Sequence, residues 1–360
     1  SCGDGPNTSS AGNGGTGGTG ASAHEMLYVA SGNNGQGQIW AFSIDPNTGA
    51  LGSPTQFSSP EFLLQMKVDP SNTFLYASDF DSGKVRAYSI DSTSGSLAEV
   101  NGSPFGSSLT SGNGGPLAIS PNGKFLFFSD SVGNLATFSI SSGTLTPGTG
   151  GQDNNQPFDF AVDPLNRYLY VANQSDSSGG DFSVFSIDAS SGGITPISGS
   201  PFTFQDNSGP FAIAVHPNGR FIYSTLSNTQ DVAGLTVDTS TGVLSKIAGS
   251  PFNTGILIPK GIAMHPSGKF LYVSAEGVSS IIIFNIDPTT GALSKLTSFT
   301  VGVVQLAIDP SGNFLYAASP AFDEVFAYKI DQGNGNLTAV PGSPFSAGVV
   351  SGALAIVNLQ

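Results

Sequence analysis

Charged residues, and basic residues above all, are scarce in this chain of 360 residues. Only 10% of the residues are Asp, Glu, Lys or Arg, and 25 acids outnumber 11 bases to give a formal net charge of −14. Binding of nucleic acids needs clustered Lys and Arg side chains that neutralise phosphates, and the sequence contains no such cluster. The composition therefore argues against a nucleic-acid partner.

Thiols and long apolar runs are also nearly absent. The single cysteine, Cys2, cannot form an internal disulfide and has no second thiol with which to build a metal site. Asp79 and Asp81 resemble the start of a calcium loop, but Lys84 stands where that loop needs glycine. No apolar run approaches the roughly 20 residues that cross a bilayer as a helix. We expect neither a metal nor another cofactor.

Cys2 precedes a segment rich in Gly, Ser, Thr and Asn, which is too polar to pack a core. We expect residues 1–24 to form a flexible linker. A small residue, a cysteine and such a linker together resemble a bacterial lipoprotein after signal cleavage, with a diacylglyceryl anchor on Cys2. The sequence thus predicts an exported protein, periplasmic or at the cell surface, that is tethered to a membrane. The alternative is that the cysteine is incidental.

Glycine and proline, by contrast, are abundant, at 48 and 23 residues, which suits short strands joined by tight turns. From residue 25 onward the chain repeats two landmarks seven times. The first landmark comprises MLYVAS, FLYASD, FLFFSD, YLYVAN, FIYSTL, FLYVSA and FLYAAS, which begin at residues 26, 74, 125, 168, 221, 270 and 314. The second follows each of these and reads SIDPNTGAL in the first unit and SISSGTL in the third. Seven copies of both landmarks predict seven structural units.

Each unit contains four short segments rich in β-branched and aromatic residues and bounded by turn residues. Four strands at a period of 40 to 50 residues are typical of a β-propeller. We therefore expect an all-β, seven-bladed propeller over residues 25–360, with four antiparallel strands per blade, as a monomer. The first unit lacks an innermost strand, and the chain ends with ALAIVNLQ, which matches the innermost strands of other units. The C-terminal strand should close the first blade.

His216 stands directly before the first turn of the fifth unit. The equivalent residues in the other units from the second to the seventh are Asp69, Ser120, Asp163, His265 and Asp309. Short polar side chains are favoured there because they accept hydrogen bonds from the turn backbone. The comparison predicts that His216 starts a turn and does no chemistry.

The units resemble the lactonase-type seven-bladed propellers, the family of 6-phosphogluconolactonase and carboxymuconate cycloisomerase, and the bacterial propellers with YVTN-type repeats. The resemblance depends on HPNGRFIY, HPSGKFLYVS and IDPTTGALS. It implies an Arg-His pair in a Gly-Pro-Arg-His pattern at the start of an innermost strand. Here the pattern reads Gly209, Pro210, Phe211 and Ala212, so the charged pair is replaced by Phe211 and Ala212. Whether the chain is an enzyme therefore stays open.

A remaining site should lie at the end of the channel opposite these turns. Candidate ligand-binding residues there are polar where sister units have small or apolar residues, or lie in loops at that end: Gln65, Lys67, Asp79, Asp130, Asp159 and Gln305. The many loop carboxylates predict an acidic rim. Two functions fit. One is a non-catalytic propeller that binds a protein, glycan or small ligand, and the alternative is a divergent lactonase or cycloisomerase that uses Lys67 and Asp159.

Overall fold

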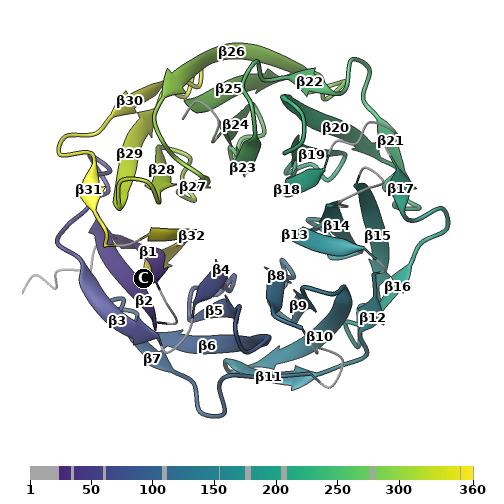
Figure 1. Ribbon diagram of the computed structural model, residues 1–360, viewed down its shortest axis with the longest axis horizontal. Coiled ribbons are helices and arrows are strands. Elements are labelled where there is room, and N and C mark those ends of the chain that lie inside the picture. The colour runs from purple at the N-terminus through teal and green to yellow at the C-terminus, as the bar shows by residue number, and fades with distance from the viewer. Residues whose placement is uncertain are drawn as a thin grey trace, which may run out of the picture.

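A computed structural model describes residues 24–33, 36–59, 62–107, 112–153, 155–174, 180–203, 209–275, 280–348 and 350–359. Their strands form seven antiparallel sheets arranged as blades around a central channel (Figure 1). The predicted seven-bladed propeller is confirmed. Cys2 and residues 1–23 of the predicted linker lie outside the described residues.

Every blade is built in the same order from the channel outward. The innermost strands are β32 (Val350–Leu359), β4 (Leu63–Val68), β8 (Gly114–Ile119), β13 (Gln156–Val162), β18 (Pro210–Val215), β23 (Pro259–Met264) and β27 (Gln305–Ile308). The second strands are β1 (His24–Asn33), β5 (Phe74–Asp79), β9 (Phe125–Asp130), β14 (Tyr168–Gln174), β19 (Phe221–Leu226), β24 (Phe270–Ala275) and β28 (Phe314–Ser319).

The outer half of each blade is more variable. The third strands are β2 (Gln36–Ile44), β6 (Lys84–Ile90), β10 (Asn134–Ser141), β15 (Asp181–Ile187), β20 (Asp231–Val237), β25 (Ser280–Ile286) and β29 (Glu324–Ile330). The outermost strands are β3 (Thr55–Ser59), β7 (Leu97–Glu99), β11 (Thr144–Pro147), β16 (Ile194–Pro196), β21 (Leu244–Lys246), β26 (Leu293–Thr300) and β30 (Leu337–Ala339). Short additional strands pair with the third strand in four blades: β12 (Gly151–Gln152), β17 (Phe202–Thr203), β22 (Phe252–Asn253) and β31 (Phe345–Ser346).

The core lies between neighbouring blades, because the second strands are apolar on both faces. All six residues of β19 are buried, and Tyr223 shares one apolar cluster with Leu271 and Val273 of the next blade. A fully buried large apolar side chain contributes about 1.5–3 kcal/mol of stability. Both sheet faces are therefore occupied, which explains the near-continuous apolar character of these strands.

The ring closes through both ends of the described chain. β32 pairs antiparallel with β1, with Tyr28 opposite Ala355 and Met26 opposite Val357. Figure 1 shows the yellow C-terminal strand beside the purple first strand. This pairing confirms that the C-terminal strand completes the first blade.

The channel has two ends. The turn end is where each innermost strand turns into the second strand, as at residues 217–219, and the mouth is the opposite end, where the innermost strands begin. At the turn end the backbone N–H of Gly219 donates to the carbonyl of His216 over 2.8 Å, and Asn218 N–H donates to His216 Nδ1 over 3.1 Å. His216 therefore starts the turn, as predicted.

Candidate functional site

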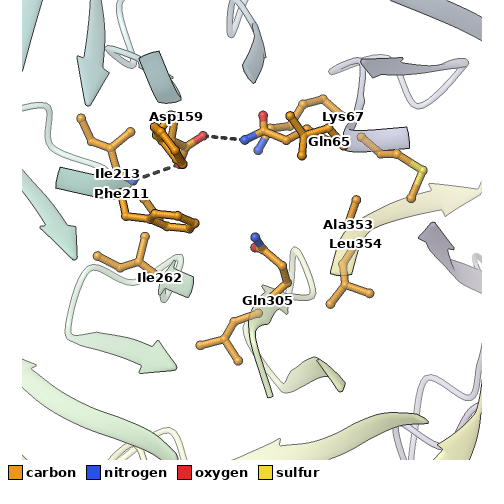
Figure 2. A pocket seen from close by; sticks show the side chains of 14 residues that line it. Gln65, Lys67, Asp159, Phe211, Ile213, Ile262, Gln305, Ala353 and Leu354 are labelled. Carbon is orange, nitrogen blue, oxygen red and sulfur yellow. Dashed lines mark hydrogen bonds between the residues drawn. The ribbon is translucent and has the colours of Figure 1, made fainter. Parts of the chain in front are cut away.

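Two adjoining cavities occupy the mouth. We call the one nearer the turn end the lower cavity and the other the upper cavity. The lower cavity, of about 130 Å³, brings together Gln65, Lys67, Asp159 and Gln305 (Figure 2). The upper cavity, of about 360 Å³, lies against the first residues of the innermost strands of five blades, and Gln65 and Gln305 are among the residues that it shares with the lower one. Four of the six residues predicted for ligand binding thus line one site.

The geometry of the innermost strands explains why backbone donors face this site. In β18, His216 N–H donates to Phe221 across the blade, and hydrogen-bonded residues alternate along an antiparallel ladder. Ile213 is consequently out of phase, with its N–H directed away from β19 and into the channel. A β-bulge between Pro210 and Ile213 interrupts the ladder above this point.

A hydrogen-bonded belt, made of Gln65, Leu117, Asp159 and Ile213, crosses the lower cavity. Gln65 Nε2 donates to Asp159 Oδ1 over 3.1 Å, and Ile213 N–H donates to Asp159 Oδ2 over 3.0 Å (Figure 2). Leu117 N–H donates to Gln65 Oε1 over 3.1 Å. The belt links four consecutive blades, and the donor on one side and the acceptor on the other fix the orientation of the Gln65 amide.

Asp159 is the acid of this belt. Phe160 N–H also donates to its Oδ1, over 2.9 Å. Burial raises the pKa of Asp159 above its usual value, although the charge of Lys67 and the donors Ile213, Gln65 and Phe160 act in the opposite direction. The site therefore contains a carboxylate with increased proton affinity beside a lysine.

Lys67 lies where the belt meets the rest of the channel. Its side chain is exposed, and it lines both the lower mouth cavity and a cavity of about 230 Å³ toward the turn end. Sister blades carry alanine at this position, for example Ala118 and Ala161. The lysine is thus a feature of one blade and gives the channel a cation at mid-depth.

The upper cavity has an aromatic wall that the sequence analysis missed. The ring centroids of Phe158 and Phe211 lie 5.1 Å apart with an interplanar angle of 43°, and Phe80 and Leu64 complete the apolar lining. Lys260 Nζ lies 5.6 Å from the centroid of the Phe211 ring. The sequence signal for this wall is Phe211, an aromatic residue at the start of innermost strand β18, where the resemblance implies Arg.

Asp79 and Asp130 do not line either cavity. Both are completely buried at the ends of second strands. Asp79 Oδ2 pairs with Arg86 Nε over 3.0 Å, and Asp130 Oδ1 accepts from Asn134 N–H over 2.9 Å. Each carboxylate therefore accepts hydrogen bonds from its own blade and loop, where Ser82 N–H also donates to Asp79 Oδ1.

Charged side chains are few in the two mouth cavities, and the described loop carboxylates of the predicted acidic rim line neither of them. Among the described residues that line them, Asp159 is the one acid and Lys67 the one base. The described part of the chain also contains no group of three or more His, Cys, Asp or Glu side chains that could hold a metal ion. No described segment forms a helix long and apolar enough to cross a membrane.

Comparison with known proteins adds a family and a fold. The sequence model of a family described as Lactonase, 7-bladed beta-propeller matches residues 19–111, 105–202 and 199–349. No curated protein sequence matches the chain.

Several solved structures have the same fold. A periplasmic gluconolactonase from Pseudomonas aeruginosa is 18% identical, with a TM-score of 0.77 over 94% of this chain and 100% of that one. A proposed 6-phosphogluconolactonase from Bacteroides fragilis is 20% identical, with a TM-score of 0.78 over 94% of this chain and 99% of that one. A functionally unknown protein from Desulfotomaculum acetoxidans is 16% identical, with a TM-score of 0.73 over 94% of this chain and 100% of that one. At these identities the likeness establishes the fold alone.

Proposed function

This chain belongs to the lactonase family of seven-bladed β-propellers, whose family model matches most of its length, and we propose that it binds a small ligand in the two mouth cavities without transforming it. The observation that carries this proposal is the belt. Both oxygens of Asp159 already accept hydrogen bonds, from Gln65, Phe160 and Ile213. Such a carboxylate orients a ligand better than it attacks one.

The replaced pair also supports binding over catalysis. Lactone opening needs a group that activates water and donors that stabilise the developing oxyanion. Phe211 and Ala212 occupy the positions where the resemblance implies Arg and His, and both line the lower cavity. Neither side chain can exchange a proton.

A divergent lactonase remains the second candidate, favoured by one observation. Asp159 has a raised pKa and shares a cavity with Lys67. In such a mechanism Asp159 accepts the proton of a water whose oxygen attacks the lactone carbonyl carbon. The Lys67 ammonium stabilises the oxyanion. The ring C–O bond then breaks while Asp159 returns the proton to the leaving oxygen, which gives a hydroxy acid.

Saturation-transfer NMR with two neutral lactones, D-glucono-1,5-lactone and dihydrocoumarin, tests the site. We expect saturable binding of at least one lactone, and its loss in Gln305→Trp, because Gln305 lines both cavities and a bulkier side chain there narrows them. Thr338→Trp, at an exposed position of outer strand β30, is the matched control. Binding of neither lactone, or binding unaffected by Gln305→Trp, overturns the proposal. A pH-stat assay of the same lactones separates the candidates, because turnover that is lost in Asp159→Asn would favour the lactonase.

Export through a lipid anchor on Cys2 is a separate part of the proposal. Its support is the Gly-rich segment that follows Cys2 and the likeness in fold to a periplasmic gluconolactonase. Expression with the native leader should place the protein in the membrane fraction, and Cys2→Ser should release it. Equal partitioning of the two forms would contradict the anchor.

A further inference from the structure

The two mouth cavities differ in chemistry. The upper cavity is lined mainly by apolar groups: Leu64, Phe80, Pro116, Pro157, Phe158 and Phe211. Its polar lining consists of neutral groups such as Gln65, Gln156 and Gln305. Among its described lining residues none is charged. Its volume of about 360 Å³ is at the small end of ligand pockets, which span roughly 300–1,000 Å³.

The apolar wall is exposed although it lies in a concave surface. Phe158 is 37% exposed and Leu64 is 36% exposed. The ring of the partly exposed Phe211 packs against Phe158 at 43°, and Lys260 Nζ lies 5.6 Å from its centroid. Isolated apolar side chains are common on surfaces, but a group of them in a concavity marks a binding groove. A ring with an apolar face would remove this surface from water.

The floor beneath this wall offers hydrogen-bond donors without a net charge. Lys67 and Asp159 are the charged residues among the described residues lining the lower cavity, and their charges cancel. Gln65 Nε2 uses one hydrogen for Asp159 and has a second one available. In Figure 2 the amide of Gln305 points into the cavity from the opposite side.

Charge disfavours an anionic ligand. Phosphate groups are usually bound by several Arg or Lys side chains or by a cluster of backbone donors. Lys67 is balanced by Asp159, and Lys260 beside Phe211 is a single further cation, so the mouth has no such cluster. The net charge of −14 repels anions at longer range. Nothing in the lining favours a cation either, because Asp159 already accepts three hydrogen bonds.

We infer that the ligand is an uncharged ring compound with an apolar face that packs on Phe158 and Phe211. A carbonyl or hydroxyl oxygen of the ring points down to Lys67 and Gln65. This inference rests on the proposed function and narrows it, because it excludes phosphorylated and other anionic sugars as the preferred ligand.

Binding of two probes to the intact chain tests the inference. Dihydrocoumarin is a neutral aromatic ring with a carbonyl oxygen, and 6-phosphogluconate is an anionic sugar acid. We expect dihydrocoumarin to bind at least about tenfold more tightly. Its dissociation constant should stay unchanged between about 0.05 M and about 0.5 M salt, since screening acts only on charged partners.

Single substitutions test whether the ligand packs on the aromatic wall of the upper cavity. Phe158→Ala and Phe211→Ala should each weaken dihydrocoumarin binding by about fivefold to tenfold. Phe322→Ala is the matched control, because Phe322 is 61% exposed in the loop before β29 and lines neither cavity. Phe158→Leu keeps an apolar side chain and should retain part of the affinity if the first variant is poorly folded.

The outcomes separate the two proposals. Tighter binding of 6-phosphogluconate overturns the inference and leaves a ligand site at the mouth. Dihydrocoumarin binding that survives both Phe→Ala variants also overturns it. If neither these probes nor D-glucono-1,5-lactone binds, the inference and the proposed function both fail.

Discussion

The two ring nitrogens of His216 form hydrogen bonds with two different blades. Nδ1 accepts from Asn218 N–H within the turn, and Nε2–H donates to the carbonyl of Gly268 in the next blade over 3.0 Å. Burial lowers the pKa of His216, which favours the neutral imidazole with one donor and one acceptor that this arrangement uses. The residue is structural, and its second contact lies beyond what the turn pattern predicts.

Replacing His216 by Asp should keep the turn and weaken the contact between blades. Asp163 caps the equivalent turn through its own carboxylate, which accepts from Tyr168 N–H. The Gly268 carbonyl would lose its donor, so we expect a loss of about 1–3 kcal/mol in the free energy of unfolding, measured with urea. Ligand binding at the mouth should be unchanged, and its loss would contradict the assignment of the site.

Glu25, at the start of β1, should make stability depend on pH. Burial first, and then the charge of Asp309, raise the pKa of Glu25 from 4.5 to about 7. The folded state therefore holds this proton more tightly than the unfolded state. The contribution of the protonated Glu25 carboxyl to the free energy of unfolding is complete below pH 4.5 and is lost as pH rises toward about 7.

The variant Glu25→Gln should remove this loss. Because Glu25 is partly exposed, the expected gain over wild type at pH 8 is only about 1–2 kcal/mol, with little difference at pH 4.5. Urea unfolding at both pH values measures it. An equal difference at the two pH values would show that Glu25 does not titrate in this way.

Between neighbouring blades, buried tyrosines of the second strands bond to glycine carbonyls in the turn of the next blade. Four hydroxyls donate in this way: Tyr28 to Gly95, Tyr223 to Gly291, Tyr272 to Gly335 and Tyr316 to Gly49. The hydroxyl of Tyr76 has no partner in the described part of the chain. The corresponding turn in the third blade, SISSGTL, is two residues shorter than its sisters.

Two matched variants test this contact. Tyr223→Phe leaves a buried carbonyl without its donor and should cost about 1–3 kcal/mol. Tyr76→Phe removes a hydroxyl without a described partner and should cost close to nothing. Equal destabilisation of the two variants, measured by urea unfolding, would show that the hydroxyl contact does not stabilise the ring.

The repeats were sufficient to predict the strands, the turns and the pairing of the chain ends, because these depend on periodicity. They also identified Gln65, Lys67 and Asp159 as polar departures from small or apolar positions. Asp79 and Asp130 were misplaced because the strand pattern does not say whether a terminal carboxylate turns inward. The direction of the Ile213 N–H depends on which residues of the ladder are hydrogen-bonded, which alternation of residue types does not encode.

The ring as a whole depends on β32. Its residues Ala353, Val357 and Leu359 belong to the apolar cluster between the first and second blades. Ending the chain at residue 349 would leave β1 as an unpaired inner edge and expose this cluster. We expect the truncated protein to lose cooperative thermal unfolding and to be cleaved rapidly by protease. A cooperative transition like that of the full chain would contradict closure by this strand.

The proposed ligand site lies at the mouth, and methyl NMR during a dihydrocoumarin titration tests that position most directly. Ile213 and Ile262 line the lower cavity, whereas Ile187 and Ile140 lie on third strands far from the channel (Figure 1). If the ligand binds at the mouth, the Ile213 and Ile262 methyl signals should shift and saturate, and those of Ile187 and Ile140 should stay unchanged. Saturable binding that leaves Ile213 and Ile262 unmoved and shifts the outer methyl groups would contradict it.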